Sequence, residues 1–418
     1  MLQKVGPVNR RRVVVTGLGV VAANGVGVEA FWRANLEGRS GISRVDAFAT
    51  DEFAVKIGGQ VRGFDPLNYM TEDLAKRVDR FVHFGMAGAQ MALTQSGLDL
   101  RPEKVEQVGV IIGSGLGGQL FHEEQIQSTL ERGFMRTNPI SVPRVSPNAV
   151  ASQIAIRYGF KGPNMVISTA CASGAHAIGE AFRKIQYGEV DVCLTGGVEA
   201  PLTRFNFSAY CAMRVLSKNN ANPTAASRPF DRDRDGFVMG EGGGILVLEE
   251  RDHALARGAP ILAELTGYAC NSGAHHMVIP EPEGADAARV MAAALADAGL
   301  SHVDYINAHA TSTKANDSAE TKAIKTVFGA AAYRIPVSST KSMIGHAIGA
   351  AGAIEAVVCV QALREHLIPP TINLDQPDPD CDLDYVAGHA RPARLQHVLS
   401  NSFGFGNCNV SLLFSQPT

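Results

Sequence analysis

The sequence predicts an α/β protein built from two related halves. Three observations lead to this expectation: short β-branched runs closed by glycine, apolar residues at helical spacing between these runs, and a tetrapeptide that occurs twice. The tetrapeptide His-Ala-Ile-Gly begins five positions after Cys171 and again five positions after Lys341. Together with the matching order of strands and helices, it favours two α/β halves, which we place at 1–260 and 261–418.

The first half is expected to alternate strands with helices. Each predicted strand is a short apolar run that ends near glycine or a hydroxyl residue, as is typical of buried strands. The predicted strands lie at 12–19, 108–112, 165–169, 191–195 and 244–248, and the predicted helices at 28–37 and from about 175 to a closing Gly188.

The second half repeats this alternation. We predict strands at 261–268, around Tyr305 and at 335–338, a helix at 285–298, and a Gly/Ala-rich helix from His346 onward. Strands that alternate with helices in this way imply mixed or parallel sheets covered by helices.

Composition excludes several classes of protein. The 418 residues are 45% hydrophobic and 19% charged with a net charge of -3, so neither disorder nor bulk attraction to nucleic acid is expected. No window is long and apolar enough to span a bilayer, and the N-terminus has no export leader pattern. The seven cysteines lack paired short spacings, which argues against disulfides and zinc motifs and favours the reducing cytoplasm.

The glycine-rich stretches do not indicate a nucleotide cofactor. Residues 17–27 and 113–118 are rich in glycine, but neither stretch has the fingerprint glycines with an acidic partner at the right distance. We interpret both as packing and pocket loops, and we expect neither a cofactor nor a metal ion.

Cys171 lies in the stretch Ser-Thr-Ala-Cys-Ala-Ser-Gly, between a predicted strand and a predicted helix. Most cysteines in such a composition are small buried hydrophobes. At a helix N-terminus, however, free N–H groups lower the pKa of a thiol and can also bind a developing oxyanion. The small Ala172 and Gly174 leave room for a substrate, so we predict that Cys171 is a nucleophile.

Two histidines occur at similar places. His309 follows a predicted strand in Asn-Ala-His-Ala-Thr-Ser-Thr, and His346 follows another, five residues after Lys341. A single histidine is more often structural than catalytic. Active sites of α/β proteins gather at the carboxyl ends of strands, so these side chains together with Cys171 predict one site.

At this point the sequence resembles the β-ketoacyl synthases, and more narrowly the bacterial type II enzymes that elongate fatty acids on acyl carrier protein. The resemblance runs from Arg11 to about Phe414. The motifs that carry it are STACASG with Cys171, NAHATST with His309, STKSMIGHAIGAAGAIEA with Lys341, His346 and Glu355, and NSFGFGNCN with Phe403 and Phe405.

The resemblance implies a thiolase-like fold, in which two βαβαβαββ halves form a five-layered αβαβα arrangement. It also implies a dimer, usually a homodimer, although a related partner chain is left open. Its Cys-His-His set distinguishes the elongating enzymes from initiating synthases, which have Asn in place of one histidine, and from chain-length factors, which have Gln in place of the cysteine.

The implied reaction is a decarboxylating condensation of an acyl chain with malonyl carrier protein. Cys171 takes the acyl chain, since a thiolate preserves the thioester, and the N–H groups of Cys171 and Phe405 form the oxyanion hole. His309 and His346 donate to the enolate that loss of carbon dioxide leaves. Lys341 orients the histidines, with Glu355 and Glu320 as acidic counterparts; for Glu320 a structural ion network is an equal alternative.

Further residues are matched to binding roles. The resemblance assigns Thr311 and Thr313 to the phosphopantetheine arm of the carrier protein and Phe403 to the acyl site. The residues expected to line the acyl pocket include Gln119, His122 and Tyr210, which are more polar than a fatty acyl chain requires. The acidic carrier is expected to dock on basic side chains at Lys76, Arg77, Arg80, Arg214 and Lys218.

The polar pocket residues allow two interpretations. The pocket accepts shorter, unsaturated or oxygenated chains, as in polyketide or polyene assembly, or His122 pairs across a dimer interface. The C-terminal glycine loop also departs from the family pattern, because Asn407 and Cys408 stand where Gly and then Thr or His are usual, and Ala310 follows His309 where glycine is common.

Two rival functions remain. A thiolase shares the fold and uses a second cysteine in its C-terminal loop, where Cys408 lies, but thiolases lack the lysine-histidine motif. A non-catalytic partner subunit of a synthase is the other rival, and the intact Cys171, His309 and His346 argue against it.

Overall fold

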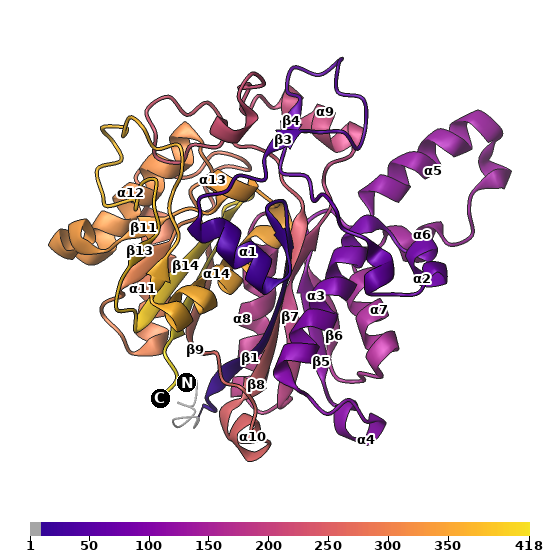
Figure 1. Ribbon diagram of the computed structural model, residues 1–418, viewed down its shortest axis with the longest axis horizontal. Coiled ribbons are helices and arrows are strands. Elements are labelled where there is room, and N and C mark those ends of the chain that lie inside the picture. The colour runs from indigo at the N-terminus through magenta and orange to yellow at the C-terminus, as the bar shows by residue number, and fades with distance from the viewer. Residues whose placement is uncertain (1–9) are drawn as a thin grey trace, which may run out of the picture.

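A computed structural model describes residues 10–418 of the chain, and its helices and strands are shown in Figure 1. The expectation that the N-terminus carries no leader falls largely on residues 1–9, outside the described range. Within the described range, no helix combines the length and the apolar character needed to cross a membrane.

One large mixed sheet runs through the described chain. It holds eleven strands, of which β2 (Gly25–Val26) pairs only with β1. The other strands follow one another in the order β11 (Val337–Ser338), β10 (Tyr305–Asn307), β14 (His397–Gly404), β15 (Cys408–Ser415), β9 (Ala263–Ser272), β1 (Val13–Ala22), β8 (Gly242–Glu250), β7 (Val192–Glu199), β5 (Gly109–Gly113) and β6 (Asn164–Ile167).

The strands before and after residue 260 repeat the same topology. In the first set, β5 is parallel to β6 and β7, and β8 is antiparallel to β7 and β1. In the second set, β10 is parallel to β11 and β14, and β15 is antiparallel to β14 and β9. A short antiparallel pairing of β1 with β9 joins the sets. The expectation of two related halves in the fold is therefore confirmed.

Helices cover both faces of each strand set and complete five layers (Figure 1). The inner layer packs against both sets and consists of α8 (Ser173–Gln186) and α14 (Ala351–Glu365). The outer layers are α3 (Arg80–Ser96) and α7 (Ala149–Tyr158) on the first set, and α11 (Ala285–Ala298) and α12 (Lys314–Phe328) on the second. This is the predicted αβαβα arrangement.

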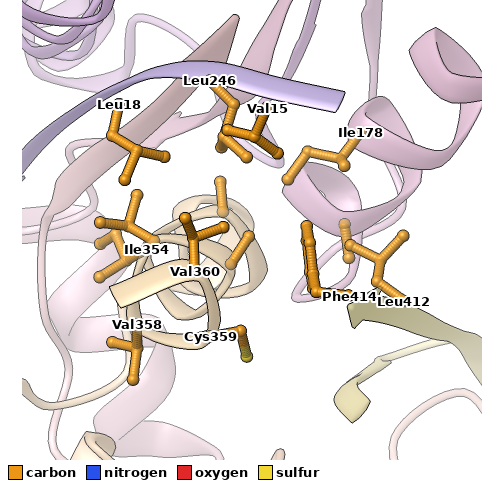
Figure 2. Close-up of a cluster of buried hydrophobic side chains, with 14 of the residues drawn as sticks. Val15, Leu18, Ile178, Leu246, Ile354, Val358, Cys359, Val360, Leu412 and Phe414 are labelled. Atoms are coloured by element: carbon orange, nitrogen blue, oxygen red, sulfur yellow. The ribbon is translucent and has the colours of Figure 1, made fainter. Parts of the chain in front are cut away.

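The main core lies around the inner helix α14, whose residues 351–363 are all buried because both strand sets enclose it. Figure 2 shows Ile354 and Val358 of this helix near Leu18 of β1 and Leu246 of β8, with Phe414 of β15 at the other side. Burying each such side chain contributes about 1.5–3 kcal/mol. The buried helix therefore fixes the two halves relative to each other.

The described chain contains further helices and strands besides these layers. They are α1 (Val28–Leu36), β3 (Ser43–Arg44), β4 (Ile57–Gly58), α2 (Glu72–Arg77), α4 (Pro102–Val105), α5 (Gln119–Arg132), α6 (Ser141–Val145), α9 (Arg204–Ala212), α10 (Arg251–Ala256), α13 (Lys341–Ile344), β12 (Leu367–Ile368) and β13 (Arg391–Pro392). In Figure 1, α5 extends away from the body of the molecule, above α6.

Most predicted elements are present with ends shifted by a few residues, and the helix at 285–298 has the predicted bounds. Gly188 follows α8 with φ 78° and donates its N–H to Ile185, as expected of a closing glycine. The sequence interpretation did not include α3, α5, α7, α12, β14 or β15.

The helix predicted from His346 onward is present as α14, but its predicted start was wrong. The His346 N–H donates to Val238 and its carbonyl accepts from Gly240, so this residue pairs with an extended segment instead. Ile348 then takes φ 46°, and α14 begins at Ala351. Long-range pairing thus overrides the local helix propensity at the residue that matters for the site.

A buried arginine fixes the loop between β10 and α12. The side chain of Arg234 is fully buried and donates to the carbonyl of Thr313 at 3.1 Å and to Asp378 at 2.6 Å. Its guanidinium also lies 3.4 Å from Asp317, whose side chain is equally buried. The loop that begins α12 is therefore tied to the charged segment before β8.

Replacing Arg234 should destabilise the fold. In Arg234→Met the carboxylate of Asp317 is left buried without its cation, so the free energy of unfolding should fall by about 3–5 kcal/mol. Urea unfolding followed by fluorescence measures this change.

Arg232→Met is the matched control, because Arg232 lies two positions away and its side chain is 57% exposed. That variant should stay within about 0.5 kcal/mol of the wild type. Equal losses in the two variants would contradict the importance of the buried pair.

Candidate active site

Cys171 lies in the turn between β6 and α8, as the sequence predicts. The preceding Ala170 has φ 51°, an uncommon conformation for a residue with a side chain, and it turns the chain from the strand into the helix. Cys171 is 5% exposed and lines a cavity of about 220 Å³.

Two backbone N–H groups face the Cys171 sulfur, one from Phe405 and one from Cys171 itself. Gly404 allows this approach, because a Cβ there would lie 2.6 Å from the Thr169 carbonyl oxygen and 3.3 Å from the Cys171 nitrogen. The structure thus brings together the pair of N–H groups predicted for an oxyanion hole.

The pKa of Cys171 differs from the sequence prediction. Burial raises the pKa of the thiol to about 12, and the Phe405 N–H, the charge of Lys341 and the Cys171 N–H oppose this only in part. The prediction of a thiol with lowered pKa was therefore wrong for this chain without substrate, because desolvation outweighs the helix terminus. The thiol carries its proton at neutral pH and must lose it during reaction.

His309 and His346 lie together at the same cavity. Their ring centroids are 5.4 Å apart and the rings are nearly perpendicular. Both residues are buried, yet Nδ1 of His309 and both ring nitrogens of His346 have no hydrogen-bond partner. Buried polar atoms are normally paired, so these nitrogens are available to a bound substrate.

The two imidazoles are neutral at neutral pH. Burial lowers the pKa of His309 well below its usual value, and the charges of Lys341 and His346 lower it further. Burial and then Lys341 lower the pKa of His346 in the same way. Each ring can therefore both donate and accept a proton in the physiological range.

Lys341 forms a buried ion pair with Glu355. Each side chain is only 1% exposed. Burial raises the pKa of Glu355 to about 7, and the neighbouring Lys341 opposes this rise. The sequence assignment of Glu355 as the acidic counterpart of Lys341 agrees with this contact.

Glu320 plays a different part. Its carboxylate accepts the N–H groups of His309 at 2.9 Å and Ala310 at 2.8 Å, and the Asn401 amide at 3.1 Å. It makes no ion pair with Lys341 among the described residues, and burial raises its pKa. Neither predicted alternative for Glu320, counterpart of Lys341 or member of an ion network, is seen among the described residues; its hydrogen bonds anchor the loop that carries His309.

Several predicted binding residues line the cavity with the catalytic candidates. They are Tyr210, Thr311, Thr313, Phe403 and Phe405. The hydroxyls of Thr311 and Thr313 lie 3.0 Å apart, at the start of α12. A polar pair next to apolar walls suits a ligand that is part amide and part hydrocarbon.

Gln119 and His122 do not line this cavity. Both lie on α5, where the Gln119 amide donates to the Leu116 carbonyl and His122 is exposed. The prediction that they line the pocket is therefore not met within this chain. A helix directed away from the sheet moves them out, which the linear sequence does not reveal.

The predicted docking residues do not form one patch in this chain. Lys76 and Arg77 are exposed on α2, and each pairs with a carboxylate one turn away. Arg214 and Lys218 are exposed after α9, next to the cavity-lining Val215, and no ion partner is seen for them within residues 10–418.

Arg80, the remaining residue predicted for carrier docking, is paired within the chain. Its guanidinium forms two hydrogen bonds with Glu241, at 2.7 and 2.9 Å, and also donates to the Val61 carbonyl. The Glu241 side chain is only 2% exposed. Arg80 thus neutralises a buried carboxylate that lies far away in the sequence.

Cys408 lies outside the cavity, whereas its neighbours Asn407 and Asn409 line it. Successive residues of a strand point to opposite faces, so the first residue of β15 is directed away from Cys171. The structure therefore does not place a second thiol beside the first, as a thiolase would need.

The sequence interpretation missed Glu199, a fully buried residue at the end of β7. Its carboxylate accepts the N–H groups of Gly115 at 2.7 Å, Leu116 at 3.1 Å and Gly349 at 3.1 Å. Burial raises its pKa to about 7. The signal was a lone acidic residue that follows Gly-Gly-Val at the end of a predicted strand, and it joins two loops next to Cys171.

The arrangement suits acyl transfer through a thioester. A thiol, two N–H groups facing it and two neutral imidazoles meet in one cavity. Across residues 10–418, no group of three or more His, Cys, Asp or Glu side chains is placed to hold a metal ion.

Family models match both halves of the chain. Residues 10–254 match the β-ketoacyl synthase N-terminal domain, and residues 262–375 match the β-ketoacyl synthase C-terminal domain. The 3-oxoacyl-[acyl-carrier-protein] synthase 2 of Synechocystis sp. is 47% identical and covers 97% of this chain and 98% of its own length. The enzyme of the same name from Vibrio cholerae is 44% identical and covers 98% and 100%.

Solved structures agree with these matches. A type II polyketide ketosynthase, in complex with its acyl-carrier protein and bound to a hexaketide, has a TM-score of 0.89 and 36% identity over 98% of this chain and 100% of its own. A β-ketoacyl synthase from Burkholderia phymatum has a TM-score of 0.90 and 34% identity over the same shares. Since sequence, structure and the Cys-His-His cavity agree over nearly the whole length, this chain belongs to the β-ketoacyl synthase family.

Proposed function

We propose that this enzyme condenses an acyl group, held as a thioester on Cys171, with malonyl-acyl carrier protein. The products are a 3-oxoacyl chain two carbons longer on the carrier protein, carbon dioxide and free carrier protein. The observation that carries the proposal is the meeting of Cys171, His309 and His346 in one cavity, with buried imidazole nitrogens that have no partner.

In the first step, Cys171 takes the acyl group from its carrier. The sulfur attacks the carbonyl carbon, and the N–H groups of Cys171 and Phe405 stabilise the oxyanion that forms. The C–S bond to the carrier then breaks, and the proton of the Cys171 thiol ends on the departing carrier thiolate. A neutral imidazole beside the thiol can relay this proton.

In the second step, malonyl carrier protein loses carbon dioxide. The electron pair of the broken C–C bond enters an enolate, whose oxygen accepts hydrogen bonds from His309 and His346. The enolate carbon attacks the acyl-Cys171 carbonyl and the new C–C bond forms. The Cys171 thiolate leaves and takes a proton from solvent, which restores the thiol. The broken C–C bond of the malonyl group supplies the electron pair for the new C–C bond. The proposal therefore includes no cofactor and no metal.

Lys341 acts through the histidines. Its buried charge disfavours their protonation, and Glu355 holds that charge in place. Both rings therefore stay neutral. A protonated ring would instead bind the malonyl carboxylate and retain it on the substrate.

Arg214 and Lys218 are the docking residues that the structure supports best for an acidic carrier protein. Both are exposed, and they lie along the chain on either side of the segment that contributes Val215 to the cavity. Unpaired surface cations next to an entrance raise the association rate of an acidic partner.

The class of acyl chain follows from Tyr210, which lines the cavity and stacks edge-on against Phe237 with ring centroids 5.8 Å apart. Burial and the nearby Cys171 and Glu199 raise the pKa of the phenol, so its O–H remains a hydrogen-bond donor. This favours oxygenated or unsaturated chains over purely saturated ones. The structural relatives include a ketosynthase bound to a hexaketide.

The assembly we propose is a homodimer in the cytoplasm. Strand β6 is an unpaired edge of the sheet with Met165 36% exposed. Exposed apolar side chains lie on α7, which packs against β6, and on α5, α6 and the segment between them, namely Ile126, Leu130, Phe134, Met135, Val142 and Ile156. An uncovered edge strand amid such a surface favours pairing with a second copy, although some structural relatives are ketosynthases with a chain length factor.

The central test is acylation of Cys171. Purified protein mixed with acyl carrier proteins that bear saturated, unsaturated or 3-hydroxy chains should gain the acyl mass, and subsequent malonyl carrier protein should convert it to a 3-oxoacyl product. Intact-protein mass spectrometry measures the adduct, and product analysis identifies the extended chain.

Cys171→Ala should abolish the adduct, whereas Cys408→Ala should retain it. Loss of activity in Cys408→Ala, with coenzyme A esters as the better substrates, would instead support a thiolase. Absence of an adduct with every chain would support the partner-subunit alternative. Arg214→Glu should slow acylation from the carrier but not from a small soluble thioester.

Removing the charge of Lys341 should change the pH dependence of turnover. Lys341 lowers the pKa of His309 and His346, so the wild type should keep its activity as the pH falls from 7 to 6. In Lys341→Met the pKa of both histidines rises, and the acidic limb of the kcat profile should move up by roughly one pH unit.

Lys325→Met provides the control, since Lys325 pairs with Asp382 away from the cavity. Its profile should match that of the wild type. An acidic limb at the same pH in Lys341→Met and wild type would show that the lysine does not act through the histidines.

Placing a charge on the edge strand should disrupt the dimer. Met165→Asp introduces a carboxylate on β6, and native mass spectrometry at micromolar concentration should then find single chains. Leu255→Asp places the same charge on another exposed apolar residue, on α10, and should remain dimeric. A wild type that is monomeric, or a Met165→Asp variant that stays dimeric, would overturn this assembly.

A further inference from the structure

The side chain of Asn407 connects the C-terminal loop to the segment 273–281. Its Oδ1 accepts the N–H groups of His275 at 3.0 Å and His276 at 3.3 Å. Its Nδ2 donates to the carbonyl of His276 at 2.9 Å and to that of Ile279 at 3.3 Å. One amide thus uses both its donors and its acceptor to bind a single segment.

The backbones of the two segments are also joined around this amide. The Gly273 N–H donates to the Asn407 carbonyl at 2.9 Å, and the Gly406 N–H donates to the Met277 carbonyl at 2.8 Å. A Cβ on Gly273 would lie 2.9 Å from the Asn407 side chain, so a larger residue there would displace the amide. The contact therefore depends on glycine at 273 as well as asparagine at 407.

The backbone at Asn407 explains why asparagine is accepted here. Its φ is 55°, in the left-handed region where glycine is usual and where asparagine is tolerated better than most side chains. Asparagine thus keeps the shape of the glycine loop and adds an amide that a glycine would lack.

The segment 273–281 is part of the cavity wall. Val278, Ile279, Pro280 and Glu281 line the same cavity as Cys171. The segment has little apolar packing of its own, because Met277 is 74% and Ile279 is 50% exposed. Its position therefore depends on hydrogen bonds, of which Asn407 makes more than any other side chain shown here.

The segment also has internal bonds that Asn407 does not touch. Nδ1 of His276 accepts the N–H groups of Val278 and Ile279, each at 3.0 Å. Hydrogen exchange at these two N–H groups shows whether the whole segment moves or whether it only loses its contact with the Asn407 amide.

We propose that Asn407 is a positioning residue that fixes segment 273–281 as a cavity wall and so limits how bulky a thioester can reach Cys171. The identity of that thioester rests on the proposed function, whereas the fixing of the wall does not. Substrate selection in this chain thereby includes a residue outside the Cys-His-His set.

Hydrogen exchange measured by NMR or mass spectrometry tests the fixing directly. Asn407→Gly fits φ 55° without strain and removes all four side-chain hydrogen bonds. The N–H groups of Val278 and Ile279 should exchange at least about tenfold faster, although their own acceptor is unchanged. If only His275 and His276 exchange faster, the wall does not depend on Asn407 and the proposal fails.

Asn373→Gly is a matched control. Asn373 also has positive φ, at 65°, and its amide donates to the carbonyls of Thr224 and Ser227, away from the cavity lining. It should leave exchange in segment 273–281 at the wild-type rate. An equal increase in both variants would show a general effect of losing asparagine.

Alkylation of Cys171 tests access without requiring turnover. In Asn407→Gly, N-phenylmaleimide should react about tenfold faster relative to the small iodoacetamide than it does in wild type, because only the bulky reagent needs the wall to yield. An unchanged ratio overturns the limit on bulk, whether or not the protein is a condensing enzyme.

Asn407→Asp guards against a folding defect in the glycine variant. It keeps the acceptor for His275 and His276 but places an oxygen against the carbonyls of His276 and Ile279, so it should loosen the wall while its melting temperature stays near that of wild type. Wild-type exchange in this variant would also contradict the proposal.

Discussion

The buried ion pair between Lys341 and Glu355 is the interaction on which the active site depends. It joins the short helix α13 to the inner helix α14, and both side chains are withdrawn from water. Removing one member of such a pair costs about 3–5 kcal/mol, because the other charge is then left without a partner. The positive charge of Lys341 lowers the pKa of His309, of His346 and of the Cys171 thiol, so the position of one side chain affects all three groups.

Burial also acts on Cys171, His309 and His346 and favours the neutral form of each. The thiol keeps its proton, and both imidazoles lack the extra one. Among the catalytic candidates, only Lys341 and Glu355 form an ion pair. Charge then develops only on the reacting atoms, where the N–H groups of Cys171 and Phe405 and the imidazole nitrogens are already in place.

Local sequence was enough to predict the features that depend only on residues adjacent in the chain. Cys171 and His309 each follow a strand, and strand ends in an α/β protein converge whatever the rest of the chain does. Features that depend on distant partners could not be predicted in this way. Arg80 looks like a surface cation until Glu241, 161 residues away, is brought to it, and His346 leaves the expected helix because it pairs with Val238 and Gly240.

The sequence by itself determined the α/β class, the repeated halves and the candidates for the reacting residues, since these follow from periodicity and from motifs of a few adjacent residues. Only the tertiary structure decided the protonation of Cys171, the anchoring role of Glu320, the place of Gln119 and His122 outside the cavity, and the contact of Asn407 with segment 273–281. Burial and hydrogen-bond partners are properties of the folded chain, because they depend on which distant segments exclude water from a group.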